Sequence, residues 1–118
     1  MKENNLIVDK SKAFAVRIIK LYKYLCDEKK EFVLSKQILK SGTSIGANVK
    51  EASKGQSKAD FIAKMSIALK EASETEYWLE LLCETDYINK EHFESIYADN
   101  EEILKILTRI IKTAKENL

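Results

Sequence analysis

The residues of this chain that could carry out chemistry are its glutamates, two cysteines and one histidine, and their spacing does not build a catalytic site. A di-metal centre in a helix bundle needs two Glu-x-x-His pairs. His92 is the single histidine, and Asn89 stands three positions before it, where such a pair requires a glutamate. No serine or cysteine has the base and orienting acid of a nucleophilic triad. We therefore expect a non-enzymatic protein with no catalytic residue, metal site or cofactor.

The two cysteines, Cys26 and Cys83, fall at apolar helical positions and do not match a metal-ligand pattern. We expect them to be structural thiols in a reducing compartment. Residues 1–5 lack the apolar core of a signal peptide, and no stretch has the apolar length needed to cross a bilayer. These observations predict a cytoplasmic protein.

Apolar residues recur at helical spacing in four segments, which predict helices at about 9–29, 36–54, 58–85 and 90–117. The chain has no proline and three glycines in 118 residues, so nothing forces these helices to break. The connections are short, which makes consecutive helices antiparallel neighbours. We expect an all-α protein, with residues 1–118 forming one antiparallel up-down-up-down four-helix bundle.

Polar residues mark the expected helix ends. Ser35, Ser57 and Asn89 precede the last three helices and are predicted to cap them through side-chain oxygens. Gly55 follows the second helix, where its tolerance of positive φ suits a C-terminal cap.

Two glycines and one glutamate inside the predicted helices suggest specific contacts. Gly42 and Gly46 lie inside the second helix at a cost in helix propensity, which close approach of a neighbouring helix would offset. Glu76 falls on the core side of the third helix, and Asn48 or a basic residue of the first helix is a candidate partner for a buried carboxylate. Glu76 could equally reach the edge of the bundle.

The net charge of +1 hides an asymmetry between the two halves of the chain. Residues 1–58 carry 13 basic and 6 acidic residues, a net +7, whereas residues 59–118 carry 7 basic and 13 acidic residues, a net −6. Intramolecular pairing, head-to-tail assembly or a basic face for an anionic partner would each explain this split.

A basic face on the first two helices would suit the phosphate backbone of RNA or DNA, especially if it were repeated around a ring. The candidate nucleic-acid-binding residues are Lys12, Arg17, Lys20, Lys23, Lys36, Lys40, Lys50 and Lys54. The alternative is a protein–protein interaction scaffold, in which the same lysines only solvate the surface.

The third helix shows apolar residues outside its core stripe, namely Ile67, Trp78, Leu81 and Leu82. A bundle uses one face of each helix, so a second apolar face implies a partner. We expect these four residues to form the interface of a homo-oligomer.

Two runs of the sequence resemble a known family. Ser41 to Ala52, read as SGTSIGANVKEA, and Ser66 to Leu82, read as SIALKEASETEYWLELL, are similar to the second-helix and third-helix signatures of the bacterial proteins encoded in intervening sequences of 23S rRNA genes. The similarity extends from about Phe14 to Ile111. The chain departs from the pattern at Gly46-Ala47, where many members carry Pro-Ser.

The resemblance implies a left-handed bundle that assembles into a homopentameric ring. This family is similar to the accessory variability determinant of diversity-generating retroelements, a basic pentameric barrel that binds nucleic acid and a reverse transcriptase. The resemblance therefore implies RNA or DNA, and a reverse transcriptase or another nucleoprotein component, as partners.

Overall fold

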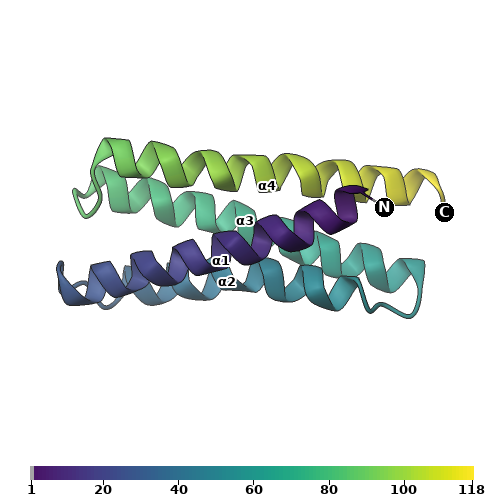
Figure 1. The fold of residues 1–118 in the computed structure, drawn as a ribbon, viewed down its shortest axis with the longest axis horizontal. Helices are drawn as coiled ribbons and strands as arrows, with labels where there is room; N and C mark the ends of the chain where they lie inside the picture. Colours follow the sequence, from purple (N-terminus) through teal and green to yellow (C-terminus); the bar gives the residue numbers. More distant parts are fainter. Residues whose placement is uncertain (1) are drawn as a thin grey trace.

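Four long helices account for most of the chain in the computed structural model, which describes residues 2–118 and their side chains from residue 4 onward. The helices are α1 (Lys2–Asp27), α2 (Leu34–Ala52), α3 (Lys58–Glu84) and α4 (Lys90–Glu116). Consecutive helices run in opposite directions, and both ends of the chain lie at one end of the bundle (Figure 1). The predicted all-α fold is confirmed.

The helices pack in the cyclic order α1, α2, α3, α4, so that α1 and α3 lie on one diagonal. Figure 1 shows α1 crossing the front of the bundle, from beside α4 near the termini to beside α2 at the other end. Each helix turns one apolar stripe toward a common core, which burial of apolar area stabilises.

Two polar contacts inside the core fix how the helices are aligned. Asn100 is fully buried in α4 and donates from Nδ2 to the backbone oxygen of Ala72 in α3, at 2.9 Å. Thr75 of α3 donates to the Ser41 hydroxyl of α2, also at 2.9 Å. Sliding either helix pair would leave buried polar groups without partners, which is costly.

Helix α1 begins about two turns earlier than the sequence pattern indicated, at Lys2 instead of residue 9. Ile7 is fully buried and extends the apolar stripe beyond Phe14. The small polar residue Ser11 interrupts this stripe and is nevertheless buried. Its burial is tolerated because its hydroxyl donates to the Val8 oxygen within the helix.

Two of the three predicted N-caps are confirmed. The Ser57 hydroxyl accepts from the Asp60 amide at 3.0 Å, and the Asn89 side chain accepts from the His92 amide at 2.7 Å. The predicted cap at Ser35 is wrong, because α2 already begins at Leu34 and Ser35 is buried in its first turn.

Glu31 takes the place of the missing cap. Its carboxylate, 9 % exposed, accepts from the backbone amides of Val33, Leu34 and Ser35 at 3.2, 3.0 and 2.7 Å. Burial by itself would raise the pKa of Glu31, but these amides and the Ser35 hydroxyl outweigh it and lower the pKa below its ordinary value. The preceding residue, Lys30, takes the left-handed conformation that turns the chain, with φ of 53°.

The positive φ expected at Gly55 is also wrong. None of the described glycines has positive φ; besides Lys30, the residue that does is Asp86, in the connection between α3 and α4.

The close approach expected at the α2 glycines is confirmed. A Cβ built on Gly42 would lie 2.7 Å from Cγ1 and 2.8 Å from Cγ2 of Ile18 in α1. At Gly46 it would lie 3.3 Å from the backbone oxygen of Ser11. Gly42 therefore admits a core side chain of α1, whereas Gly46 lets the two backbones approach.

Candidate nucleic-acid interface

The outer face of α2 is basic. Its buried residues, which include Ile38, Ile45 and Val49, turn one side of the helix toward the core. Helical geometry then places Lys36, Lys40 and Lys50 on the other side of the helix. These three lysines are exposed, and so is Lys54 in the turn that follows α2. None forms a salt bridge with any residue that the structure describes.

Helix α1 adds Lys12, Lys20 and Lys23 to this surface. All three are exposed, and over the described chain they too lack a carboxylate within salt-bridge distance. Seven of the eight residues proposed from the sequence are therefore exposed lysines without a salt bridge among the described residues, and one of them, Lys40, is close enough to Glu71 for its charge to oppose the raised pKa of that carboxyl.

Arg17 is the exception, because it is half-buried and its guanidinium already has partners in its own subunit. Its guanidinium donates to Asp99 at 2.7 Å and to Ser95 at 2.7 Å, both on α4. Lys10 pairs with Glu102 of α4 in the same way, at 2.8 Å. Intramolecular pairing thus accounts for part of the charge asymmetry, along the side where α1 faces α4.

A groove of about 390 Å³ runs between α1 and α2 inside this basic surface. Lys12 and Lys50 lie in its lining together with small residues, and the close contact at Gly46 forms part of its floor. The full lining is Val8, Ser11, Lys12, Ala15, Thr43, Gly46, Ala47 and Lys50.

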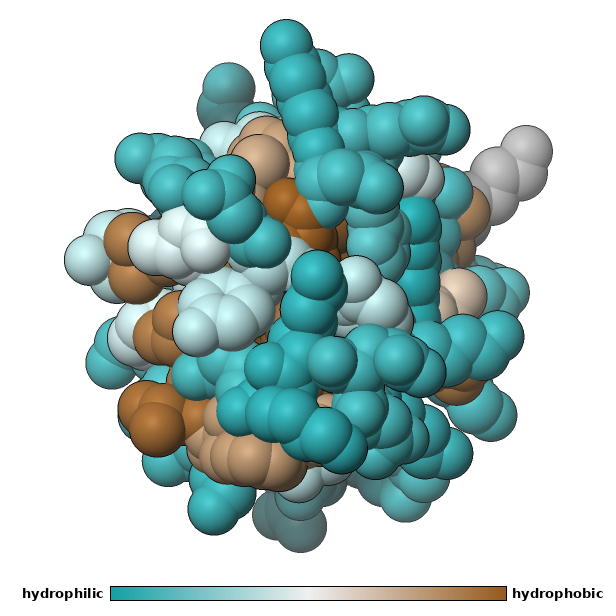
Figure 2. Space-filling view, turned by 90° about the vertical axis from the view of Figure 1, so that its left-hand side faces the viewer, coloured by the Kyte–Doolittle hydropathy of each residue, from teal (hydrophilic) through white to brown (hydrophobic). Residues whose placement is uncertain are grey.

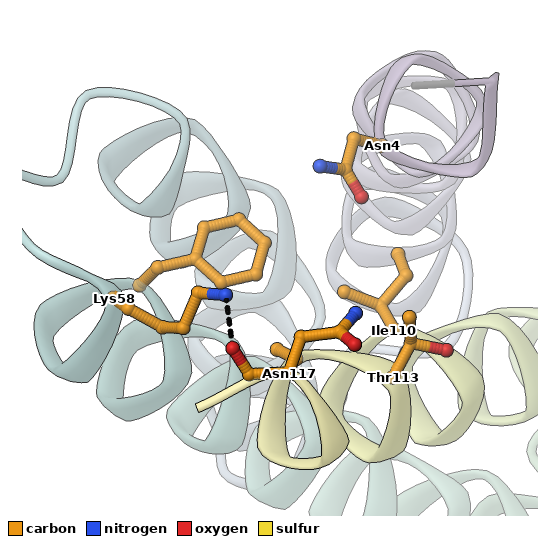
Figure 3. Close-up of a pocket in the computed structure, with 7 residues that line it drawn as sticks. Asn4, Lys58, Ile110, Thr113 and Asn117 are labelled. Atoms are coloured by element: carbon orange, nitrogen blue, oxygen red, sulfur yellow. Dashed lines mark hydrogen bonds between the residues drawn. The ribbon is translucent and has the colours of Figure 1, made fainter.

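A second, smaller pocket of about 200 Å³ lies at the end of the bundle where α1 and α3 begin and α4 ends (Figure 3). Lys58 donates to the backbone oxygen of Asn117 across it, at 3.0 Å. Asn4, Ile110 and Thr113 complete the residues labelled in Figure 3. Its described lining contains no carboxylate, imidazole or thiol, so acid–base and nucleophilic chemistry have no side chain there.

The residues expected at an oligomer interface divide into two groups. Ile67 is 41 % exposed, and Trp78 and Leu81 are half-buried on the bundle surface. Leu82 is fully buried, so its assignment to a surface interface is wrong. Helix α3 packs against both α2 and α4, which widens its core stripe until it includes Leu82.

Tyr77 is an exposed residue that the sequence reasoning missed. It is 55 % exposed, on the outer side of α3 that also carries Ile67, ten residues earlier. Ten residues make about 2.8 turns, so the two side chains point roughly 80° apart, and helical spacing from Ile67 places Tyr77 only at the edge of that side.

Glu76 does not meet Asn48 or a base of α1, as the sequence suggested. It faces Glu101 and Tyr97 of α4, and Asn48 donates to Ser44 of its own helix. The contact with Glu101 raises the pKa of Glu76 most, followed by burial, and Tyr97 partly offsets both. The Tyr97 hydroxyl donates to Glu80 at 3.0 Å.

We expect Glu76→Gln to raise the melting temperature at pH 7 and to have little effect at pH 4. The pKa of Glu76 is raised in the folded protein, so the stability that this group supplies is complete below its unfolded pKa and is lost as the pH rises through the folded pKa. Thermal unfolding at both pH values tests this, with the exposed Glu28→Gln as control. An equal shift at both pH values would contradict the proposed repulsion.

Among the described residues, no three His, Cys, Asp or Glu side chains are grouped so that they could hold a metal ion. Cys26 and Cys83 are free and half-buried. His92 is half-buried against Tyr24; burial, followed by the charge of Arg17, lowers its pKa. None of the four described helices is long and apolar enough to pass through a membrane.

These features define a four-helix bundle with a basic surface over two adjacent helices and an acidic opposite half. The chain belongs to the 23S rRNA-intervening sequence protein family, whose model matches residues 3–109.

A solved structure of similar sequence has the same fold. It is a protein of unknown function from the S23 ribosomal protein family of Bacteroides thetaiotaomicron VPI-5482, with 64 % sequence identity and a TM-score of 0.92. The alignment covers 93 % of this chain and 98 % of that one. No curated protein matches the chain.

Proposed function

We propose that this protein is a cytoplasmic, non-enzymatic homo-oligomer that binds RNA or DNA through the lysines of α1 and α2. The observation that carries the proposal is the set of seven exposed lysines without a salt bridge among the described residues. The family resemblance suggests a pentamer that acts as a nucleoprotein adaptor, with a reverse transcriptase or similar protein as a further partner.

The spacing of the lysines suits a phosphate backbone. Lys36 and Lys50 are 14 residues apart, or roughly 21 Å along α2 at 1.5 Å per residue. One subunit offers few phosphate contacts, but a ring repeats them, and multivalency raises avidity by about 10²–10⁴ where all sites can bind together.

The chemistry of this surface favours sequence-independent binding of nucleic acid. The outer face of α2 carries lysines and small residues, and it has no aromatic side chain on which a base could stack. Lysine contacts to phosphates carry no base information. We therefore expect affinity for nucleic acid of mixed sequence and a steep decline with salt.

Reversing the charge of four lysines on and just after α2 should weaken this binding strongly. We expect Lys36→Glu, Lys40→Glu, Lys50→Glu and Lys54→Glu together to weaken binding at least tenfold, because each removes a phosphate contact and adds repulsion. Fluorescence anisotropy with labelled RNA and DNA at two salt concentrations measures the effect. Arg17 is left unchanged, because its loss would break the pair with Asp99.

The matched control reverses Lys105, Lys112 and Lys115, three exposed lysines on α4. It should bind like the wild type. Equal weakening in both variants, or no wild-type binding at low salt, would show that the α2 lysines only solvate the surface.

That result would favour the second candidate, a protein–protein scaffold. The exposed apolar side chains of Ile67 and Tyr77 on α3 support it independently of the lysines.

A further inference from the structure

We propose that the pocket where α1 and α3 begin and α4 ends (Figure 3) binds one nucleotide, with the base inside the pocket and the phosphate beside Lys58. This site goes beyond the proposed function, because it lies outside the basic faces of α1 and α2 and does not depend on their lysines.

The volume of the pocket limits its ligand to one ring system. It measures about 200 Å³, which is less than the roughly 300–1,000 Å³ of pockets that hold drug-sized molecules. Three helices form its walls, since Asn4 comes from α1, Phe61 from α3 and Ile110 from α4. A single planar base suits such a space, whereas a stack of bases or a folded peptide does not.

The inner wall of the pocket is apolar. Phe61, Ile110 and Ala114 line it; Ile110 is buried, and the other two residues are half-buried. Proteins that bind single-stranded nucleic acid place the flat faces of bases against aromatic and aliphatic side chains of this kind. The pocket therefore offers the aromatic contact that the outer face of α2 lacks.

A side-chain oxygen at this pocket has no hydrogen-bond partner. Asn4 is half-buried, and its Oδ1 atom is buried without a donor among the described residues. Figure 3 shows the Asn4 side chain reaching from α1 toward the space that Lys58 and Asn117 border from the other side. A buried acceptor without a donor costs free energy, so a ligand that brings an N–H group to Asn4 is favoured.

The free oxygen of Asn4 favours a base with an amino group on its edge. A side-chain amide pairs with adenine at two points, because its oxygen accepts from the N6 amino group while its nitrogen donates to N7. A fatty acid or another simple carboxylate has no donor for Asn4. We therefore expect adenine to fit this pocket best among the bases.

Lys58 supplies a positive charge for the phosphate. Its ammonium group donates to the backbone oxygen of Asn117 at 3.0 Å, which leaves its other N–H donors for an anion. None of the described carboxylates lies within salt-bridge distance of it. Lys54 and Lys115 are exposed at the same end of the bundle and add to the positive potential.

The two ends of the bundle differ in charge. Residues 54–64 and 109–118, at the end that holds the pocket, carry 6 basic and 2 acidic side chains. Residues 27–36 and 84–91, at the opposite end, carry 4 basic and 6 acidic side chains. Figure 2 shows that opposite end, where hydrophilic side chains surround scattered hydrophobic areas. The positive end favours a ligand of net negative charge, such as a nucleotide, over an uncharged or zwitterionic molecule.

Calorimetric titration with AMP and its parts tests this site. AMP should bind, whereas adenosine, which lacks the phosphate, and ribose 5-phosphate, which lacks the base, should each bind about tenfold or more weakly. UMP, whose base has no amino group, should also bind more weakly than AMP. Equal binding of AMP and ribose 5-phosphate, or no binding of AMP to the wild type at millimolar concentration, would overturn the proposal.

Two variants alter the site from exposed positions, and circular dichroism checks that their helices remain. Thr113→Trp fills the pocket from its rim, and Lys58→Glu reverses the charge beside it; each should weaken AMP binding about tenfold or more. The matched control is Lys90→Glu, because Lys90 is exposed and begins α4 as Lys58 begins α3, but at the opposite end of the bundle. It should bind AMP like the wild type, and normal AMP binding by Thr113→Trp would show that the pocket is not the site.

A labelled single-stranded oligoadenylate identifies the source of the nucleotide. If Thr113→Trp weakens the binding of both AMP and the oligoadenylate, the site takes an unpaired base of a strand; if it weakens AMP binding alone, the ligand is a free nucleotide. Lys36 and Lys40 lie in the first two turns of α2, far from the pocket. Lys36→Glu with Lys40→Glu should therefore leave AMP binding unchanged, so that this site and the basic surface can fail separately.

Discussion

Replacing Gly42 by leucine is expected to lower the free energy of unfolding by about 1–3 kcal/mol, because the new side chain has no space. Even a Cβ at this position would lie 2.7 Å from Cγ1 of Ile18. Ile18 is fully buried, and the atoms in conflict lie close to its own backbone, so the side chain cannot swing away. Helix α1 must instead move away from α2 and lose core contacts.

Gly46→Ala is the matched control for this prediction. Its Cβ would lie 3.3 Å from the Ser11 oxygen, a tight contact that a small shift relieves. Alanine also gains about 1 kcal/mol in helix propensity over glycine, so we expect a small net change. Urea unfolding of both variants measures the difference. If Gly42→Leu were as stable as Gly46→Ala, the α1–α2 packing described above would be wrong.

The sequence predicted that these two glycines lie at a close helix contact, but not which one a core side chain fills. Periodicity gives the direction of each side chain around its own helix. It does not give the distance between two helices or their axial alignment, and these place Ile18 opposite Gly42 and the Ser11 backbone opposite Gly46. The helices themselves were predictable because their apolar stripes are long and regular.

The same limit explains the outcome at Arg17 and at Leu82. Arg17 and Lys20 are three residues apart, and both lie outside the apolar stripe of α1. Only the packing of α1 beside α4 brings Asp99 to Arg17, while Lys20 remains exposed. Leu82 lies outside a narrow stripe, yet it is buried because α3 has two neighbours. Surface roles are therefore less predictable than helices.

The start of α2 shows a local feature that the sequence also left hidden. Ser35 matched the usual cap type, whereas Glu31 lies three residues before the helix and caps it from there. The turn at Lys30, which has positive φ without a glycine, brings the carboxylate back over the helix end. A lysine followed by a glutamate does not predict a turn with positive φ, so the sequence by itself favoured Ser35 as the cap.

Glu31→Ala is expected to destabilise the protein by about 2 kcal/mol at pH 7, because it leaves three backbone amides of the first turn of α2 without their charged acceptor. Glu31→Gln keeps one amide oxygen but no charge, so about half of this loss is expected. Urea unfolding of the two variants and the wild type gives these values directly.

The effect of Glu31→Ala should disappear in acid. The pKa of Glu31 is lower in the folded protein than its ordinary value of 4.5, so its contribution is complete above that value and is lost as the pH falls through the folded-state pKa. Wild type and Glu31→Ala should therefore differ in stability at pH 7 and converge well below pH 4.5. This dependence is opposite in sign to that of Glu76, whose neighbour is a second carboxylate instead of backbone amides. A Glu31→Ala deficit that persists unchanged in acid would mean that the side chain stabilises the turn by packing and not by its charge.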